Sequence, residues 1–268
     1  MNAEDITQQK IAAYLNSRTD LKPASLNRYR STMSMIYAEG IRNGKVKTNP
    51  ARLVRLRRED NARIRFLTFE EEALIRSIIR KRCPTHEPDF VAAIETGMRL
   101  REQHRSEWTC LSFERRQIEL IDTKNGKSRV IPLSDEAFAA FKDCAKPKPA
   151  SRKKNAKPRP ITQRIFLSRY GQPMENPRAW FELVMAEATK KDAKLSDVTW
   201  HVLRHTYISR LVMAGVDLRT VAELAGHKTL SMTMRYAHLA PEHKQDAMRK
   251  LSDYRKKNSS VRKSSQVV

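Results

Sequence analysis

Residues 200–239 read WHVLRHTYISRLVMAGVDLRTVAELAGHKTLSMTMRYAHL, and this stretch decides the fold of the chain. It predicts a helix that begins near Thr199 and a second helical segment after Ala214-Gly215, with Asp217 suited to cap the second one. A helix-turn-helix over residues 202–227 is one interpretation of such a pair. The polar residues of the same stretch favour a different interpretation.

These polar residues are groups suited to phosphodiester chemistry. His201 and Arg204 stand three residues apart, so a helix presents both on one face. His227 follows a glycine, and Tyr236 comes nine residues later. An arginine fork suits phosphate oxygens, and a tyrosine beside a base can act as a nucleophile. A plain DNA-binding helix pair has no need of this set.

The charge of the chain indicates a polyanionic partner. Among 268 residues, 53 are Lys or Arg and 30 are Asp or Glu, which gives a net charge of +23. Double-stranded DNA attracts such a surplus. An RNA-binding protein of the ribosomal type and a membrane-surface protein are the alternatives, but no long basic amphipathic helix with a broad apolar face is evident. The N-terminus lacks a signal-peptide pattern, and no apolar run is long enough to cross a membrane, so we expect an intracellular protein.

No metal or nucleotide cofactor is expected. Cys83, Cys110 and Cys144 are widely spaced, and no C-x-x-C pair suggests a zinc site or a disulfide framework. The chain has neither a carboxylate cluster suited to Mg²⁺ nor a Walker-type glycine-rich loop.

The first 60 residues are predicted to be helical and basic. Ser25 could cap a helix whose apolar residues recur at three- and four-residue steps, and Asn49-Pro50 ends the segment that follows. Residues 52–65 are rich in arginine and are interpreted as a linker, with a domain boundary near 63–66. We therefore expect domains at 1–63 and 64–255, followed by a disordered polar tail at 256–268.

The next segment predicts helices and then a hairpin. Thr68-x-x-Glu71 forms a capping box ahead of an apolar helix, and residues 90–101 form a second one. Residues 117–122 and 129–133 alternate like strands around Asn125-Gly126, a strong two-residue turn signal.

Two further segments are predicted from composition. Residues 142–169 are strongly basic and contain four prolines, which is typical of a mobile loop that DNA could hold. Residues 242–254 predict a helix.

Four separate segments together resemble the tyrosine recombinase, or phage integrase, family. Residues 96–102, TGMRLRE, are similar to its T-G-[LM]-R-x-x-E signature, and TKNGK at 123–127 is similar to its hairpin turn. The H-x-x-R box at 201–204 and the later His227 and Tyr236 complete the order. The resemblance covers roughly residues 20–255, including KPASLNRY at 22–29, which is similar to a segment of the family's core-binding domain.

The resemblance implies a role for each matching residue. Tyr236 is the expected nucleophile, His201 its candidate base, and Lys124 the candidate proton donor to the leaving 5′-hydroxyl. Glu102 and His205 are expected to support the site, and a structural role for His205 is an equal alternative. The implied catalytic residues are Arg99, Lys124, His201, Arg204, His227 and Tyr236. The residues expected to contact DNA are Lys22, Asn27, Arg28, Arg30, Lys127 and Arg129.

The implied fold is mainly α with a small antiparallel β-sheet: a short helical DNA-binding segment, a truncated core-binding domain, precedes a tyrosine-recombinase catalytic domain. The implied activity is site-specific DNA recombination through a covalent 3′-phosphotyrosyl intermediate, integrating or excising a phage or mobile element in the bacterial cytoplasm. Four protomers would assemble on paired double-stranded DNA sites, with an accessory DNA-bending or directionality protein as a possible partner. A non-catalytic, truncated DNA-binding relative and a type IB topoisomerase-like nicking-closing enzyme are the alternatives.

Overall fold

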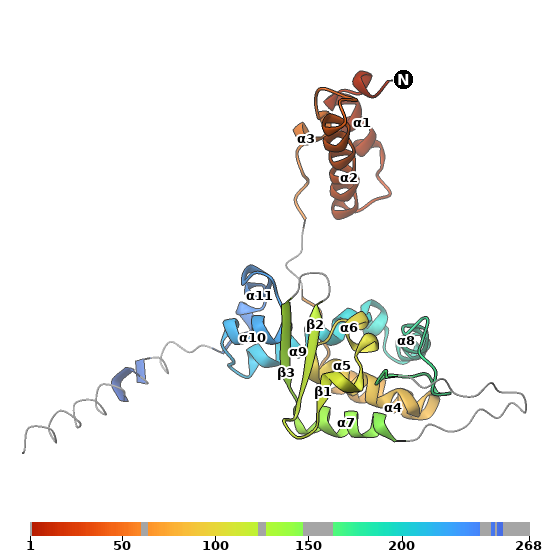
Figure 1. The fold of residues 1–268 in the computed structure, drawn as a ribbon, viewed down its shortest axis with the longest axis vertical. Coiled ribbons are helices and arrows are strands. Elements are labelled where there is room, and N and C mark those ends of the chain that lie inside the picture. The colour runs from red at the N-terminus through yellow and green to blue at the C-terminus, as the bar shows by residue number, and fades with distance from the viewer. Residues whose placement is uncertain are drawn as a thin grey trace, which may run out of the picture. The chain divides into compact units, whose positions relative to one another are not determined.

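The computed structural model describes residues 2–59, 64–122, 127–146, 163–241, 248–249 and 251–253. The chain forms two compact units, residues 1–63 and 64–268 (Figure 1). The described part is mainly helical, with one small antiparallel sheet in the second unit. The fold class expected from the sequence is confirmed.

The first unit is a small helical bundle. It contains α1 (Gln8–Ser17), α2 (Pro23–Arg42) and the short α3 (Pro50–Leu53). The N-cap of α2 is Lys22, with Pro23 at the first helical position, so Ser25 is not the cap that the sequence suggested. Proline fixes the φ angle that the first helical turn needs. It has no backbone N–H, but an N–H at this position would have no acceptor within the helix. The core of the unit consists of Ile11, Leu15, Leu26, Tyr37, Val46 and Ala51.

Part of the segment predicted as a linker, residues 52–65, belongs to this unit as far as residue 59, and residues 60–63 lie outside the described residues. The Asn27 side chain accepts from the backbone N–H of Arg57 at 2.8 Å and donates to its carbonyl at 2.9 Å. Arg57 in turn donates to the Leu15 carbonyl at 3.1 Å and to Asn16 at 2.7 Å. These bonds tie residues 54–59 back onto α1 and α2.

The second unit opens with the predicted capping box. Thr68 accepts from the N–H of Glu71, and the Glu71 carboxylate accepts from the N–H of Thr68, so α4 (Phe69–Arg82) is capped as expected. Acidic residues fill its first turn and basic residues its last, which complements the helix dipole.

The helix expected at 90–101 is interrupted. Helix α5 (Glu87–Thr96) ends at Gly97 with φ +60°, and α6 (Leu100–Arg105) starts after a break. A side chain at Gly97 would collide with the ring of Tyr207, so glycine is required by both the left-handed backbone and the packing. Arg99 therefore stands outside α5, in extended backbone at the N-cap of α6.

The sheet has strands β1 (Leu111–Ser112), β2 (Gln117–Asp122) and β3 (Lys127–Pro132), antiparallel in that order. Ile118 pairs with Ile131, and both are fully buried. The antiparallel pairing of two strands is as predicted, although β3 begins two residues earlier, and the turn at Asn125-Gly126 lies outside the described residues. Helix α7 (Asp135–Ala145) follows.

The basic segment at 142–169 is only partly described. Its first residues belong to α7, which reaches Ala145. Near its end, Arg164 forms an antiparallel β-bridge with Glu107. These two ends are therefore ordered parts of the fold, and residues 147–162 lie outside the described residues.

The remaining helices are α8 (Ala179–Lys191), α9 (Trp200–Met213), α10 (Leu218–Ala225) and α11 (Ser231–Met234). Thr199 is the N-cap of α9, and Asp217 caps α10 by accepting two backbone N–H groups, so both predicted helices are confirmed. Of the helix expected at 242–254, residues 248–249 and 251–253 are helical and the others lie outside the described residues. None of the described helices is long and apolar enough to cross a membrane. The short 3-10 helices are η1 (Ala3–Asp5), η2 (Pro84–His86), η3 (Trp108–Cys110), η4 (Ala193–Asp197) and η5 (Ala237–Leu239).

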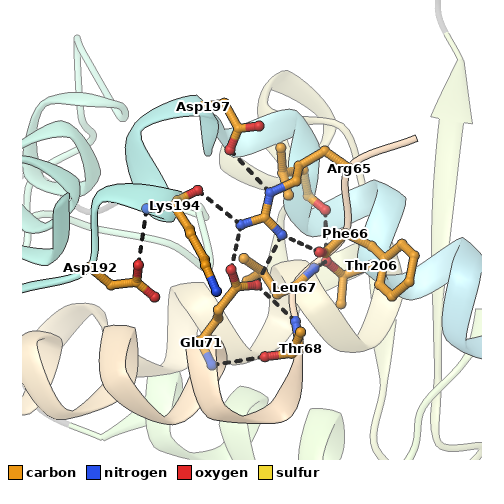
Figure 2. Close-up of polar contacts among 10 residues, drawn as sticks. Arg65, Phe66, Leu67, Thr68, Glu71, Asp192, Lys194, Asp197 and Thr206 are labelled. Carbon is orange, nitrogen blue, oxygen red and sulfur yellow. Dashed lines mark hydrogen bonds and ion pairs between the residues drawn. The ribbon is translucent and has the colours of Figure 1, made fainter. Parts of the chain in front are cut away.

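A polar cluster around Arg65, the Arg65 anchor, fixes the start of the second unit (Figure 2). Arg65 donates to both carboxylate oxygens of Glu71, at 2.9 and 2.6 Å, and to Asp197 at 3.0 Å. Beside it, the N–H of Leu67 donates to the buried hydroxyl of Thr206 at 2.9 Å. The entering chain is therefore attached to α4, η4 and α9 together.

Candidate active site

The candidate site lies where the C-terminal ends of α5 and α10 meet the first turns of α9. Arg204, on α9, is 3% exposed. Its guanidinium donates to the Gly97 carbonyl at 2.7 Å and to the Ala225 carbonyl. Carbonyls at helix C-termini lack intrahelical partners and carry partial negative charge, so they suit a buried cation.

Arg99 is held in a complementary way. Its Nη1 donates to Glu102 Oε1 at 2.5 Å, and its Nη2 donates to the Gly226 carbonyl at 3.3 Å. Each of the two left-handed glycines that follow α5 and α10, Gly97 and Gly226, thus holds one arginine. The side chain of Arg99 is 41% exposed, whereas Arg204 is buried, so Arg99 is the more accessible of the two arginines to a ligand.

The surroundings of Arg204 lower its pKa without neutralising it. Burial, and then the positive charges of Arg99 and Arg129, lower the pKa of Arg204 to about 10. At neutral pH the group stays charged. Two arginines held this close repel each other, and a bound anion would relieve that repulsion.

Arg129, expected to contact DNA, lies inside the site. Its side chain is 14% exposed and donates to Glu102 Oε2 at 2.7 Å and Oε1 at 3.3 Å. Burial alone would raise the pKa of Glu102, but the hydrogen bonds and charge of Arg129, together with Arg99, lower it to about 2. Sequence reasoning missed this role because Arg129 reads as an ordinary surface cation beside a hairpin turn.

His227 is positioned by α11. Its Nδ1 is 2.7 Å from the hydroxyl of Thr233, a fully buried residue. Burial, and then the charges of Arg204, Arg99 and Arg129, lower the pKa of His227 to about 4, so the ring is neutral at pH 7. Because Thr233 engages Nδ1, Nε2 is the ring nitrogen left for a contact with a ligand.

Tyr236 is withdrawn from solvent. It is 3% exposed, and its hydroxyl is hydrogen-bonded to Nδ1 of His205. Burial raises the pKa of Tyr236, partly offset by the charges of Arg204 and Arg235. The phenol is therefore protonated and occupied.

The histidine at the Tyr236 hydroxyl is His205, not the expected base His201. The two rings lie 4.7 Å apart and nearly perpendicular, with His201 more exposed. Burial lowers the pKa of both histidines, that of His205 to about 4. The i, i+4 spacing of these histidines on α9 was the signal that placed both near the tyrosine.

The described site does not include the other expected site residues. Lys124 and the side chain of Lys127 are outside the described residues. In the first unit, Arg30 donates to the carbonyls of Val54 at 3.0 Å and Arg52 at 2.6 Å, and Asn27 holds Arg57, so both side chains serve the unit's own structure. Lys22 and Arg28 are exposed. In the part of the chain that the structure describes, no group of three His, Cys, Asp or Glu side chains could hold a metal ion.

A comparison with models of protein families tests the resemblance that the sequence motifs suggested. The model described as the phage integrase family matches residues 65–243. The chain belongs to this family. The matched residues include every described group of the site.

Known recombinases are similar over most of this integrase-family chain. The shufflon-specific DNA recombinase of Escherichia coli is 28% identical over 250 residues, which cover 89% of this chain and 59% of that protein. Tyrosine recombinase XerC of Pediococcus pentosaceus is 26% identical over 247 residues, covering 89% of this chain and 78% of its own. The chain thus spans less than two thirds of the first of these relatives.

Solved integrase structures share the fold. The Tn1549 transposon integrase in complex with transposon right end DNA matches with a TM-score of 0.74 at 22% identity, over 93% of this chain and 86% of that one. A lambda integrase dimer bound to a COC′ core site matches with a TM-score of 0.67 at 22% identity, over 90% and 83%. At this identity the likeness establishes the fold.

Proposed function

We propose that this protein is a site-specific DNA recombinase that cleaves and rejoins strands through Tyr236. The observation that carries the proposal is the pair of arginines held by backbone carbonyls, Arg99 and Arg204, together with Tyr236, whose hydroxyl is bonded to His205. Two charged forks and a neutral imidazole suit the oxygens of one phosphodiester, and the phenol supplies a nucleophile.

The proposed chemistry is a transesterification. The Tyr236 oxygen bonds to phosphorus while the bond to the 5′-oxygen breaks, so one phosphoester replaces another. Arg99, Arg204 and His227 would stabilise the charge on the non-bridging oxygens. The phenol proton passes to a base, and the 5′-oxygen takes a proton, for which Lys124 is the proposed donor. Since the phosphotyrosyl bond retains the energy of the phosphodiester, rejoining needs no ATP.

Tyr236 has to leave His205 before it can attack. We assign His205 the role of resting partner and His201, the more exposed ring at the start of α9, the role of general base.

The larger assembly is part of the proposal. A lambda integrase in the same fold, matching with a TM-score of 0.65, is described as a tetramer bound to a Holliday junction. We propose a similar set of four protomers on paired DNA sites for this chain, and integration or excision of a phage or mobile element as its purpose. Lys22 and Arg28 of the first unit are the proposed DNA contacts there.

Covalent trapping tests the function. The protein would be mixed, in EDTA and without ATP, with duplexes from the DNA flanking its gene, each nicked so that the cleaved fragment diffuses away. We expect an SDS-resistant protein–DNA band in the wild type and none in Tyr236→Phe, which loses one oxygen and should bind DNA equally well. Tight binding without a band would identify a non-catalytic DNA-binding relative.

A second readout separates recombination from relaxation. Supercoiled plasmids with one or two copies of the trapped site would be incubated with the protein. A recombinase requires two copies for product, whereas efficient relaxation of the one-site and site-free plasmids would indicate a topoisomerase-like enzyme.

A further inference from the structure

Arg129 touches both groups that hold Arg99. One is Glu102, whose two oxygens accept from Arg129 at 2.7 and 3.3 Å and from the Arg99 side chain and backbone at 2.5 and 2.9 Å. The other is Gly226, whose carbonyl accepts from Arg99. A Cβ on Gly226 would stand 2.6 Å from Nη1 of Arg129, so the guanidinium packs directly against that residue.

The balance of charge among Arg99, Glu102 and Arg129 also gives Arg129 a role. Glu102 alone would neutralise Arg99 and leave a pair with no net attraction for a phosphate. With Arg129 on the same carboxylate, the three groups carry one net positive charge, at the partly exposed Arg99 end. Because Arg99 and Arg129 share Glu102, Arg99 keeps its orientation without losing its electrostatic attraction for an anion.

We propose that Arg129 is a positioning residue: acting through Glu102 and against Gly226, it fixes the fork of Arg99 toward the scissile phosphate. The inference rests on the proposed function and assigns to strand β3 a part in it. Arg129 then reaches no DNA itself, although it is an arginine in a basic protein. Lysine cannot replace it, because a single ammonium cannot make two parallel bonds to Glu102.

Single-turnover cleavage with the full chain tests this role. Arg129→Ala and Arg129→Lys would be compared with Arg115→Ala, an exposed arginine before β2 whose loss removes the same charge. At saturating protein, we expect the rate constant for covalent complex formation to fall at least about tenfold in both Arg129 variants. DNA affinity should change no more than it does in Arg115→Ala.

Two further readouts distinguish positioning from general stability. Adding Glu102→Gln to Arg129→Ala should slow cleavage by much less than the product of the single effects, because both act on Arg99 through one path. Carboxyl NMR of the free wild-type protein should give a pKa of about 2 for Glu102. In Arg129→Ala the same titration should give a higher pKa. That titration requires no DNA and no activity.

The outcomes separate the two proposals. If the wild type cleaves DNA and both Arg129 variants cleave it at the same rate, the positioning role is overturned and the proposed function stands. Full activity in Arg129→Lys would also overturn it, since charge without a fork would then suffice. Absence of any covalent complex in the wild type would overturn the proposed function, and this role with it.

Discussion

At the scale of single residues, burial decides the ionisation of the site. His205 and His227 both have pKa values lowered to about 4, with desolvation as the main cause, and the pKa of Tyr236 is raised by burial. The arginines stay charged, so the site at pH 7 combines fixed cations with neutral hydrogen-bonding groups. The cations suit the oxygens of a phosphate ligand. The neutral phenol suits a group that becomes a nucleophile only when a base takes its proton.

His104, outside the site, provides a pH prediction. Neither of its ring nitrogens has a hydrogen-bond partner within the described structure, and the ring lies 5.7 Å from that of Trp200 and 5.8 Å from that of Phe166. Burial lowers its pKa from 6.5 to about 4. The unfolded chain therefore binds more protons between these values, and stability is lost as the pH falls through this window.

We expect His104→Phe to remove this part of the acid sensitivity. Between about pH 8 and pH 5, wild type should lose about 2 kcal/mol of unfolding free energy from this residue alone, and the variant should not. Urea unfolding at both pH values measures the difference. An identical pH dependence in the two proteins would show that His104 is solvated or paired in solution.

At the scale of elements, helix ends position the chemistry. Local signals predicted the capping box at Thr68, the cap at Asp217 and the antiparallel strands, since each depends on residues close in sequence. The structure brings together Arg99 and Arg204, both of which the resemblance named, at the carbonyls of the neighbouring residues Gly226 and Ala225. Their bracing by Gly97 and Gly226 could not be predicted, because it depends on carbonyls more than twenty residues away, brought close only by packing.

The same limit explains what sequence reasoning misjudged. The break after α5 depends on Tyr207, which lies against Gly97 from another helix. The fold-back of residues 54–59 depends on Asn27, and the burial of Arg129 depends on Glu102. In each case an arginine-rich or helix-forming segment has a tertiary partner that its own composition does not reveal.

The Arg65 anchor supports a prediction at this scale. In Thr206→Val, the backbone N–H of Leu67 loses its buried acceptor, and we expect a loss of about 1–3 kcal/mol of stability. Thr206→Ser retains the hydroxyl and is the matched control. Thermal unfolding of both variants checks this; equal melting temperatures for Val and Ser would mean that the bond contributes nothing.

At the scale of the whole molecule, the charge of +23 is spread over both units and favours binding to any DNA. We expect affinity for random duplex to fall at least about a thousandfold between about 50 and 200 mM salt, as for six or more phosphate contacts. Fluorescence anisotropy with wild type and Tyr236→Phe should give the same slope. A fall of less than about tenfold would mean that the surplus charge faces away from the DNA.

The hydrogen bond between Tyr236 and His205 has a consequence for the cell that carries this protein. On the proposed function, a protein with a net charge of +23 spends most of its time on chromosomal sequences that are not its targets. On the proposed function, the burial of Tyr236 at each of those encounters would keep the protein from leaving nicks or covalent protein–DNA adducts behind it. Under the same proposal, release of the tyrosine is a second requirement for cleavage, in addition to DNA binding.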